Sequence, residues 1–332
     1  MTEKSAEVTE GSGGLVGVAA AQFAPVADKQ ANIEHIGELT AQARGRGARL
    51  VVFPEYSAFF TPRLGPRMLA AAEAVDGPFV AGLATLADRL DVTIVAGLAE
   101  KSPEAARFFS TVVAVAPRHG VVASYRKQHI YDAFGARESE WVRPGALGEP
   151  QTFSLGPFRV GLQACYDVRF PEVTRTLLDA GADVVAVPAE WVPGPSKQEH
   201  WRTLLSARAI ENTVFVIGAG QTAPGGIGDS VILDPAGTAL SELSTEPGLA
   251  VATLSPRLLS HVRETNPSLR LRRYAVVPGR PGEAGSVREG ADGRSEGGLA
   301  QFIPKGEGRH RHRIDDAQQG DGSFMHKEGA GR

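Results

Sequence analysis

Short apolar runs rich in valine, isoleucine and leucine recur along this chain, and they constrain its fold more than any other feature. The clearest runs span residues 15–21, 48–53, 93–97, 111–116, 158–164, 184–187, 214–218, 230–233 and 249–254. Alanine-rich, helix-like stretches lie among them, at 33–46 and within 68–90. This alternation predicts an α/β fold, and the near-continuous apolar character predicts sheets that are covered on both faces.

The two ends of the chain differ in composition from the part between them. Residues 1–14 are polar and lack the apolar stretch of a secretory signal, so we expect a flexible tail. Residues 281–332 contain 12 of the 39 glycines, few apolar residues and no periodicity, which predicts a disordered tail over 278–332. No linker interrupts residues 15–277, and we therefore expect one domain there.

The composition argues against several kinds of partner. A net charge of −3 and a pI near 6.3 argue against binding to nucleic acid. No stretch reaches the length of about 18 uncharged apolar residues that would predict a membrane span. The single cysteine excludes a disulfide within the chain, and a reactive thiol would favour a reducing compartment, so we expect a cytoplasmic protein.

That cysteine, Cys165, lies where an apolar strand is expected to end and a polar loop to begin. Such a position holds a side chain rigidly and still presents it to a substrate. Two other strand ends carry groups that could activate a thiol, because Glu55 follows the run 49–53 and Lys127 follows a strand beginning at 121. Each residue taken alone is most simply explained as a buried thiol or a solvated charge. Their combination favours a catalytic site.

Three motifs around these residues resemble the nitrilase or carbon-nitrogen hydrolase superfamily. They are Phe-Pro-Glu ending at Glu55, Tyr-Arg-Lys-Gln-His-Ile-Tyr-Asp containing Lys127, and Cys-Tyr-Asp-Val-Arg-Phe-Pro-Glu beginning at Cys165. Further blocks that look like family landmarks lie at 187–191, 197–201, 207–213 and 228–237. The resemblance therefore covers roughly residues 15–277, and the agreement of so many ordered blocks makes it specific.

The resemblance implies a four-layer α-β-β-α sandwich and a Glu-Lys-Cys triad. Glu55 would be the general base and Cys165 the nucleophile, while Lys127 and the backbone N–H of Tyr166 would stabilise the oxyanion. Glu138 would be the family's second glutamate, which helps to position the lysine and the substrate. Members of the family commonly dimerise, so we expect a homodimer or higher homo-oligomer that packs through the helices at 170–180 and 197–213.

Aromatic and charged side chains near the motif-bearing strand ends are candidates for binding the substrate. They are Tyr131, Phe134, Tyr166, Arg169 and Trp191, with Phe59 as a further candidate. Each has an ordinary alternative, because aromatic side chains at strand ends often pack in a core and Arg169 could pair with Asp167 or Glu172. His129 and His200 lack the sequence context of a Cys–His dyad, and we expect His129 to be structural.

The predicted function is hydrolysis of a small amide through a Cys165 thioester, with release of ammonia and a carboxylic acid. The residues around Cys165 and the short His-Ile-Tyr-Asp-Ala-Phe-Gly loop look most like the omega-amidase and deaminated-glutathione-amidase branch. A nitrilase or an N-carbamoyl amidohydrolase would use the same triad, and a non-catalytic interaction protein could keep the fold. We expect neither a metal nor an organic cofactor, since metal-ligand spacings and a phosphate-binding glycine turn are lacking.

Overall fold

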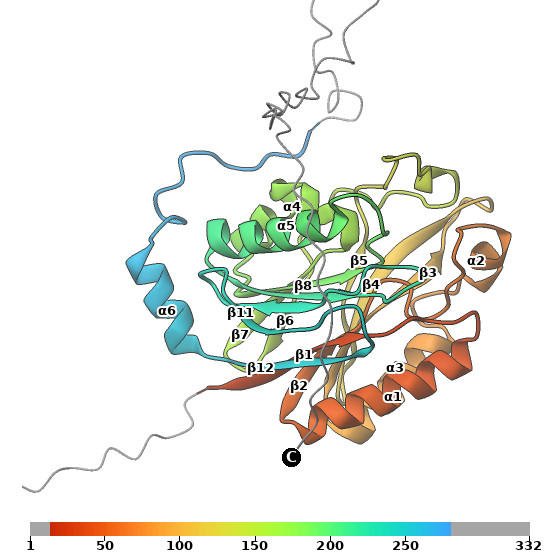
Figure 1. Cartoon of the computed structure of the whole chain (residues 1–332), viewed down its shortest axis with the longest axis horizontal. Helices are drawn as coiled ribbons and strands as arrows, with labels where there is room; N and C mark the ends of the chain where they lie inside the picture. The colour runs from red at the N-terminus through yellow and green to blue at the C-terminus, as the bar shows by residue number, and fades with distance from the viewer. Residues whose placement is uncertain (1–13, 280–332) are drawn as a thin grey trace, which may run out of the picture. The chain divides into compact units, whose positions relative to one another are not determined.

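The computed structural model describes residues 14–279, which contain two six-stranded mixed sheets (Figure 1). The strands of the first sheet are β1 (Val16–Gln22), β2 (Ala48–Val52), β3 (Thr93–Lys101), β4 (Phe108–Ala116), β5 (Gly120–Arg126) and β12 (Gly248–Leu254). Their order is β12-β1-β2-β3-β4-β5. β1, β2 and β3 are parallel, whereas β4, β5 and β12 each pair antiparallel with their neighbours.

The second sheet repeats this plan. Its strands are β6 (Thr152–Leu155), β7 (Phe158–Leu162), β8 (Val184–Ala189), β9 (Phe215–Gly220), β10 (Val231–Leu233) and β11 (Ala239–Glu242), in the order β11-β10-β9-β8-β7-β6. β7, β8 and β9 are parallel, and the outer strands pair antiparallel. Each half of the chain thus brings the carboxyl ends of three parallel strands to one edge of a sheet, where loops can carry functional side chains.

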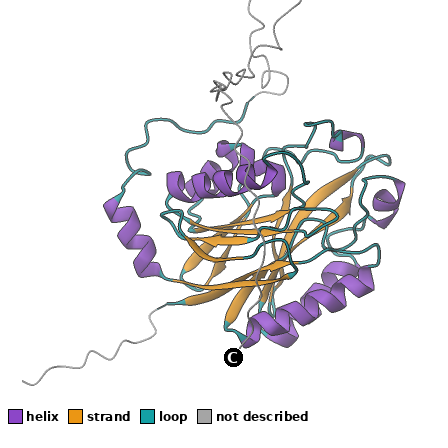
Figure 2. Ribbon diagram, in the orientation of Figure 1, coloured by secondary structure: helices purple, strands orange, loops and turns teal. Residues whose placement is uncertain are grey.

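Helices cover the outer face of each sheet (Figure 2). The helices are α1 (Lys29–Gly45), α2 (Pro66–Ala71), α3 (Pro78–Leu90), α4 (Pro171–Asp179), α5 (Lys197–Asn212) and α6 (Pro256–Thr265). Apolar side chains of α1 and α3 pack on the first sheet, and those of α4 and α5 pack on the second. The resulting order of layers, helix, sheet, sheet, helix, confirms the predicted four-layer sandwich.

The side chains of the central strands alternate between two cores. On β2, Leu50 and Val52 lie in the core between the sheets, whereas Val51 packs in the core under α1 and α3. On β8, Ala186 lies between the sheets and Val185 packs under α4 and α5. Both faces of these strands are therefore buried, which is why their sequences read as apolar runs without polar alternation.

Most predicted elements are present, with ends that differ by a few residues. The apolar runs do not predict β6 or β11, because β6 has only four residues and β11 is largely exposed at the rim of its sheet. The helix predicted at 33–46 begins earlier, at Lys29, because the Asp28 carboxylate accepts hydrogen bonds from the N–H groups of Gln30 and Ala31. Helix α6, whose N-cap is Ser255, is also absent from the prediction.

The sequence also predicts the lack of a membrane span, two tails, the domain limits, a homo-oligomer and a cytoplasmic location. None of the helices within residues 14–279 is long and apolar enough to cross a membrane. The tails predicted at 1–14 and 278–332 lie almost wholly outside the described residues. The domain limits 15–277, the homo-oligomer and the cytoplasmic location stay predictions.

Candidate active site

The carboxylate of Glu55 is buried in a tight turn after β2. Tyr56 has a φ of 56°, and a Cβ on Gly97 of β3 would lie 2.8 Å from both the Glu55 Cα and the Tyr56 nitrogen. Ser110 Oγ donates a hydrogen bond to Glu55 Oε1 at 2.6 Å, and the N–H of Glu190 donates to Oε2 at 3.2 Å. Glycine at position 97 therefore lets β3 pack directly against the turn, and the carboxylate is fixed from two sides.

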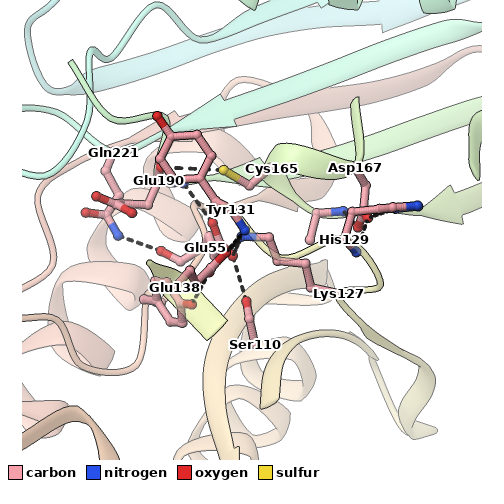
Figure 3. Close-up of polar contacts among 12 residues, drawn as sticks. Glu55, Ser110, Lys127, His129, Tyr131, Glu138, Cys165, Asp167, Glu190 and Gln221 are labelled. Carbon is pink, nitrogen blue, oxygen red and sulfur yellow. Dashed lines mark hydrogen bonds and ion pairs between the residues drawn. The ribbon is translucent and has the colours of Figure 1, made fainter. Parts of the chain in front are cut away.

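The ammonium of Lys127, at the end of β5, lies between two buried carboxylates (Figure 3). Its Nζ is 3.2 Å from Glu55 Oε1 and 2.8 Å from Glu138 Oε1. Burial alone would lower the pKa of Lys127, but the charges of Glu138 and Glu55 outweigh it and hold that pKa well above its usual range. The lysine is therefore a permanent cation at neutral pH.

Glu138 comes from a short 3-10 helix, Glu138–Glu140, in the loop after β5. Its Oε1 accepts a hydrogen bond from the Tyr56 hydroxyl at 3.1 Å, and its Oε2 accepts one from the N–H of Tyr131 at 2.6 Å. Burial raises the pKa of this carboxyl, Lys127 lowers it and Glu55 raises it again. A single lysine thus compensates two carboxylates, and neither acid has a second cation in contact among residues 14–279.

Cys165 begins a 3-10 helix, Cys165–Arg169, shortly after β7 ends. Its φ is 42°, a left-handed conformation that costs a residue with a side chain about 1–3 kcal/mol. The Sγ atom lies 3.4 Å from the main-chain oxygen of Glu190. Burial raises the pKa of the thiol, and Glu55 adds to this more than Lys127 opposes it, so the pKa is well above its usual range. The free site therefore holds a thiol and no preformed thiolate.

Asp167 links the 3-10 helix that begins at Cys165 to the loop that follows β5 through hydrogen bonds (Figure 3). Its Oδ1 accepts the N–H of His129 at 3.0 Å and lies 2.8 Å from His129 Nδ1. Its Oδ2 accepts hydrogen bonds from the Tyr125 hydroxyl at 2.8 Å and from the N–H of Ala164 at 3.3 Å. His129 thus contacts Asp167, in the turn that begins at Cys165, and does not line the cavity beside Cys165.

A cavity of about 520 Å³ opens onto Cys165, a size that suits a small molecule. The predicted residues that line it are Lys127, Tyr131, Glu138, Tyr166 and Trp191. Phe134 and Arg169 do not line it, since Phe134 is 67% exposed and the Arg169 guanidinium stacks 5.1 Å from the ring centroid of Trp191. Phe59 packs in the apolar cluster around Met68 instead. No group of three or more His, Cys, Asp and Glu side chains within residues 14–279 is arranged to hold a metal ion.

Two further charged residues of the cavity lie in the sequence blocks 187–191 and 197–201, to which no site role was assigned. Glu190 follows β8, and Lys197 is the first residue of α5. β8 is the parallel neighbour of β7, the strand that leads to Cys165. Because the carboxyl ends of neighbouring parallel strands meet at one edge, the position of Glu190 directly after β8 was the signal that could have identified it.

Glu190 contacts both candidate catalytic side chains through its backbone, but its own carboxyl is free. Within residues 14–279 that carboxyl has no ion-pair partner within 4.0 Å and no hydrogen bond. Burial raises the pKa of Glu190 well above its usual range, and the charge of Glu55 raises it further. The charge of Lys127 opposes this rise only in part, because Lys127 already faces two other carboxylates.

Replacing Glu190 with glutamine is expected to lower the pKa of the Cys165 thiol, because the charge of Glu190 contributes to raising it. The pH dependence of Cys165 alkylation by iodoacetamide measures this, and its midpoint should move to lower pH. Glu55→Gln should move the midpoint further, because Glu55 is the larger of the two charge effects. A midpoint that moves to higher pH in Glu190→Gln would contradict this account of the site.

The fold and site together describe a two-sheet sandwich with a buried thiol, an ammonium and two carboxylates around one cavity. The carbon-nitrogen hydrolase family model matches residues 17–264. The chain belongs to the carbon-nitrogen hydrolase family, which confirms the family that the motifs predict.

Two relatives and one solved structure are similar over most of the chain. A Mycobacterium tuberculosis protein described as a hydrolase is 35% identical over 269 residues, which are 76% of this chain and 94% of that protein. The deaminated glutathione amidase of Escherichia coli O157:H7 is 34% identical over 258 residues, 78% of this chain and 97% of that enzyme. A glutamate-to-glutamine mutant of the amidase from Nesterenkonia sp. AN1 has a TM-score of 0.64 and 30% identity, covering 75% of this chain and 97% of that chain. Its structure shows the result of Michael addition of acrylamide at the active-site cysteine.

Proposed function

We propose that this protein hydrolyses the carbon-nitrogen bond of a small amide through a thioester on Cys165. The observation that carries the proposal is the position of Lys127, held between Glu55 and Glu138 at the cavity that opens onto the cysteine. A thiol needs a base, and the developing oxyanion needs fixed positive charge. Lys127 lines the cavity, and Glu55, which does not line it, contacts Lys127 at 3.2 Å. The amidase names of the E. coli and Nesterenkonia relatives support an amide as substrate.

In the proposed acylation, Cys165 attacks the amide carbon while Glu55 takes the thiol proton. This transfer accompanies the attack, because the pKa of the thiol is too high for a preformed thiolate. The carbonyl oxygen becomes negative and is stabilised by Lys127 and by the N–H of Tyr166. As the second residue of the 3-10 helix, Tyr166 has no acceptor for this N–H within the helix.

Collapse of this intermediate breaks the carbon-nitrogen bond, and Glu55 returns its proton to the departing nitrogen to release ammonia. The acyl group stays on Cys165 as a thioester. Water then attacks the thioester carbon while Glu55 takes a proton from it, and the sulfur leaves and regains the proton. The products are a carboxylic acid and the free thiol, so the site returns to its initial state without a cofactor.

Ammonia release from small amides tests the proposal, with nitriles and N-carbamoyl compounds as competing substrate classes. We expect the amides to react, and Cys165→Ala to lower kcat by about 10⁴-fold or more, because the covalent route is lost. Preference for nitriles or carbamoyl compounds would assign the same triad to another reaction. Correctly folded protein that releases no ammonia from any class would instead support a non-catalytic interaction protein.

A further inference from the structure

Asp167 is a buried acid of the Cys165–Arg169 3-10 helix, and the proposed reaction does not use it. Among residues 14–279, no Lys or Arg nitrogen lies within 4.0 Å of its carboxylate. The carboxylate instead accepts hydrogen bonds from the Tyr125 hydroxyl and from the N–H groups of Ala164 and His129. A buried charge is costly unless it is hydrogen-bonded, and a connected buried network is rigid. Asp167 therefore fixes the position of the groups that donate to it.

Two of these donors lie on either side of Lys127 in the chain (Figure 3). Tyr125 precedes the lysine by two residues on β5, and His129 follows it by two. The N–H of Lys127 donates to the main-chain oxygen of Ser110 on β4, so the lysine continues the pairing of β5. Side chains two residues apart on a strand point to the same face, and Tyr125 lies in the core between the sheets. Lys127 therefore points toward the second sheet, which carries Cys165.

The cysteine side of this connection is a short element with a strained first residue. Cys165 has a φ of 42°, and 3-10 helices have poorer hydrogen-bond geometry than α-helices. The N–H that Asp167 accepts from Ala164 belongs to the residue directly before the cysteine. Phe170, directly after the helix, stacks on the His129 ring with 3.7 Å between the ring centroids. Both ends of the helix are thus attached to the segment around the lysine.

The Lys127 ammonium itself has no hydrogen bond to this helix within the described part of the chain, because its acceptors belong to Glu55 and Glu138. We propose that Asp167 is a positioning residue that sets the distance between the Lys127 ammonium and the Cys165 sulfur across the two sheets. This inference rests on the proposed amide hydrolysis, in which the sulfur attacks the carbonyl carbon while the ammonium stabilises its oxygen. An error of about 1 Å in such an arrangement lowers a rate by up to about 10²-fold.

The base is connected to the sulfur by a separate route. The N–H of Glu190 donates to Glu55 Oε2, and the main-chain oxygen of Glu190 lies 3.4 Å from the Cys165 Sγ. Over residues 14–279, Asp167 has no hydrogen bond to Glu55 or Glu190. Substitution of Asp167 should therefore displace Lys127 relative to the sulfur and leave the base beside the thiol.

The kinetics of ammonia release from small amides test this role. Asp167→Asn keeps the size of the side chain, but its NH₂ group meets a donor where the carboxylate accepts one. We expect kcat to fall by about 10- to 100-fold and KM to change by less than about 3-fold. Asp229→Asn is the control, because Asp229 is similarly buried and pairs with Arg202, and it should lower the melting temperature without changing kcat of the folded protein.

Tyr125→Phe is the milder variant, because it removes one donor to Asp167 and keeps the ring. It should lower kcat by about 3-fold or more, and it replaces Asp167→Asn if the latter does not fold. Melting curves establish that each variant is folded. An unchanged kcat in folded Asp167→Asn, or in folded Tyr125→Phe where Asp167→Asn does not fold, would overturn the inference.

A double-mutant cycle shows whether Asp167 acts through the lysine. Lys127→Gln removes the charge and keeps hydrogen-bond donors for the two carboxylates, and Lys127→Arg replaces it in the kinetic cycle if it does not fold. In the Lys127→Gln background, Asp167→Asn should lower kcat by less than about 3-fold, because the ammonium that it positions is already absent. Losses that multiply would show that Asp167 does not act through Lys127, and would reject the inference.

Alkylation of Cys165 by iodoacetamide gives the same cycle without turnover. Lys127 lowers the pKa of the thiol, so Lys127→Gln should slow alkylation at neutral pH. This effect should shrink in the Asp167→Asn background, and an undiminished effect there would contradict the positioning role. Coupled alkylation rates without Cys165-dependent ammonia would reject the proposed hydrolysis and retain Asp167 as the residue that positions Lys127.

Discussion

Glu55→Gln is expected to lower kcat for amide hydrolysis by about 10²- to 10⁴-fold, the range lost when a positioned general base is removed. Three donors surround this carboxylate: the Ser110 hydroxyl, the Lys127 ammonium and the N–H of Glu190. A glutamine can satisfy only those facing its oxygen, and its amide nitrogen can accept no proton. The glutamine side chain would therefore occupy the position of Glu55 but could not act as a base.

The same substitution should make Cys165 more reactive toward iodoacetamide at neutral pH. The charge of Glu55 raises the pKa of the thiol, and glutamine removes that charge while Lys127 stays near. Slower turnover with faster alkylation identifies a base when the melting curve of the variant matches that of the wild-type protein. The melting curve is needed because unfolding would expose this buried thiol and would also speed its alkylation. Glu38→Gln, on the exposed face of α1, provides the matched control and should change neither rate.

Lys127→Met is expected to lower the free energy of unfolding by about 3–5 kcal/mol at neutral pH, because it leaves buried carboxylates without their cation. Loss of an oxyanion-stabilising group should also reduce kcat by about 10²-fold or more. Urea unfolding and ammonia release measure the two effects. Glu138→Gln added to Lys127→Met should restore part of the stability and none of the activity, because one unpaired charge is removed while the oxyanion still lacks its cation.

The stability of the Lys127→Met variant should change with pH in a definite direction. Lys127 lowers the pKa of Glu138 in the native protein, so its removal raises that pKa further above the value in the unfolded chain. The native state then binds a proton that the unfolded state releases, and stability falls as pH rises through this interval. The stability deficit should thus be smaller at about pH 5 than at about pH 8. An equal deficit at both values would show that packing, and not charge, is lost.

The sequence predicts the central strands and the motif residues well. It predicts poorly which other residues lie near the site. The central strands are predicted because both of their faces are buried, and three motifs predict Glu55, Lys127 and Cys165 as site residues before any distance is known. Lys197 and Glu190 face the same cavity from the second sheet and its helix layer. Their approach to Tyr131 and Glu55 depends on how the two sheets pack, and no local pattern encodes that geometry.

The exposed loop after β5 also shows why the sequence alone could not predict which residues line the cavity. Phe134 has a φ of 55° and projects largely into solvent, whereas Tyr131, in the same loop, lines the cavity. Both are aromatic and both follow the lysine motif, so residue type and proximity could not distinguish them. The hydrogen bond from the N–H of Tyr131 to Glu138 fixes one of them toward the site.

Glu55 and Lys127 follow strands of one sheet, and Cys165 follows a strand of the other, so the apolar layer between the sheets acts as a spacer for the reaction. Val52 and Leu162 belong to that layer and lie close in sequence to the groups they separate. Face-to-face sheets stand about 10 Å apart, and the volume of the intervening side chains sets that gap. The length of the proposed proton path from sulfur to carboxylate is therefore determined mainly by apolar residues such as Val52 and Leu162.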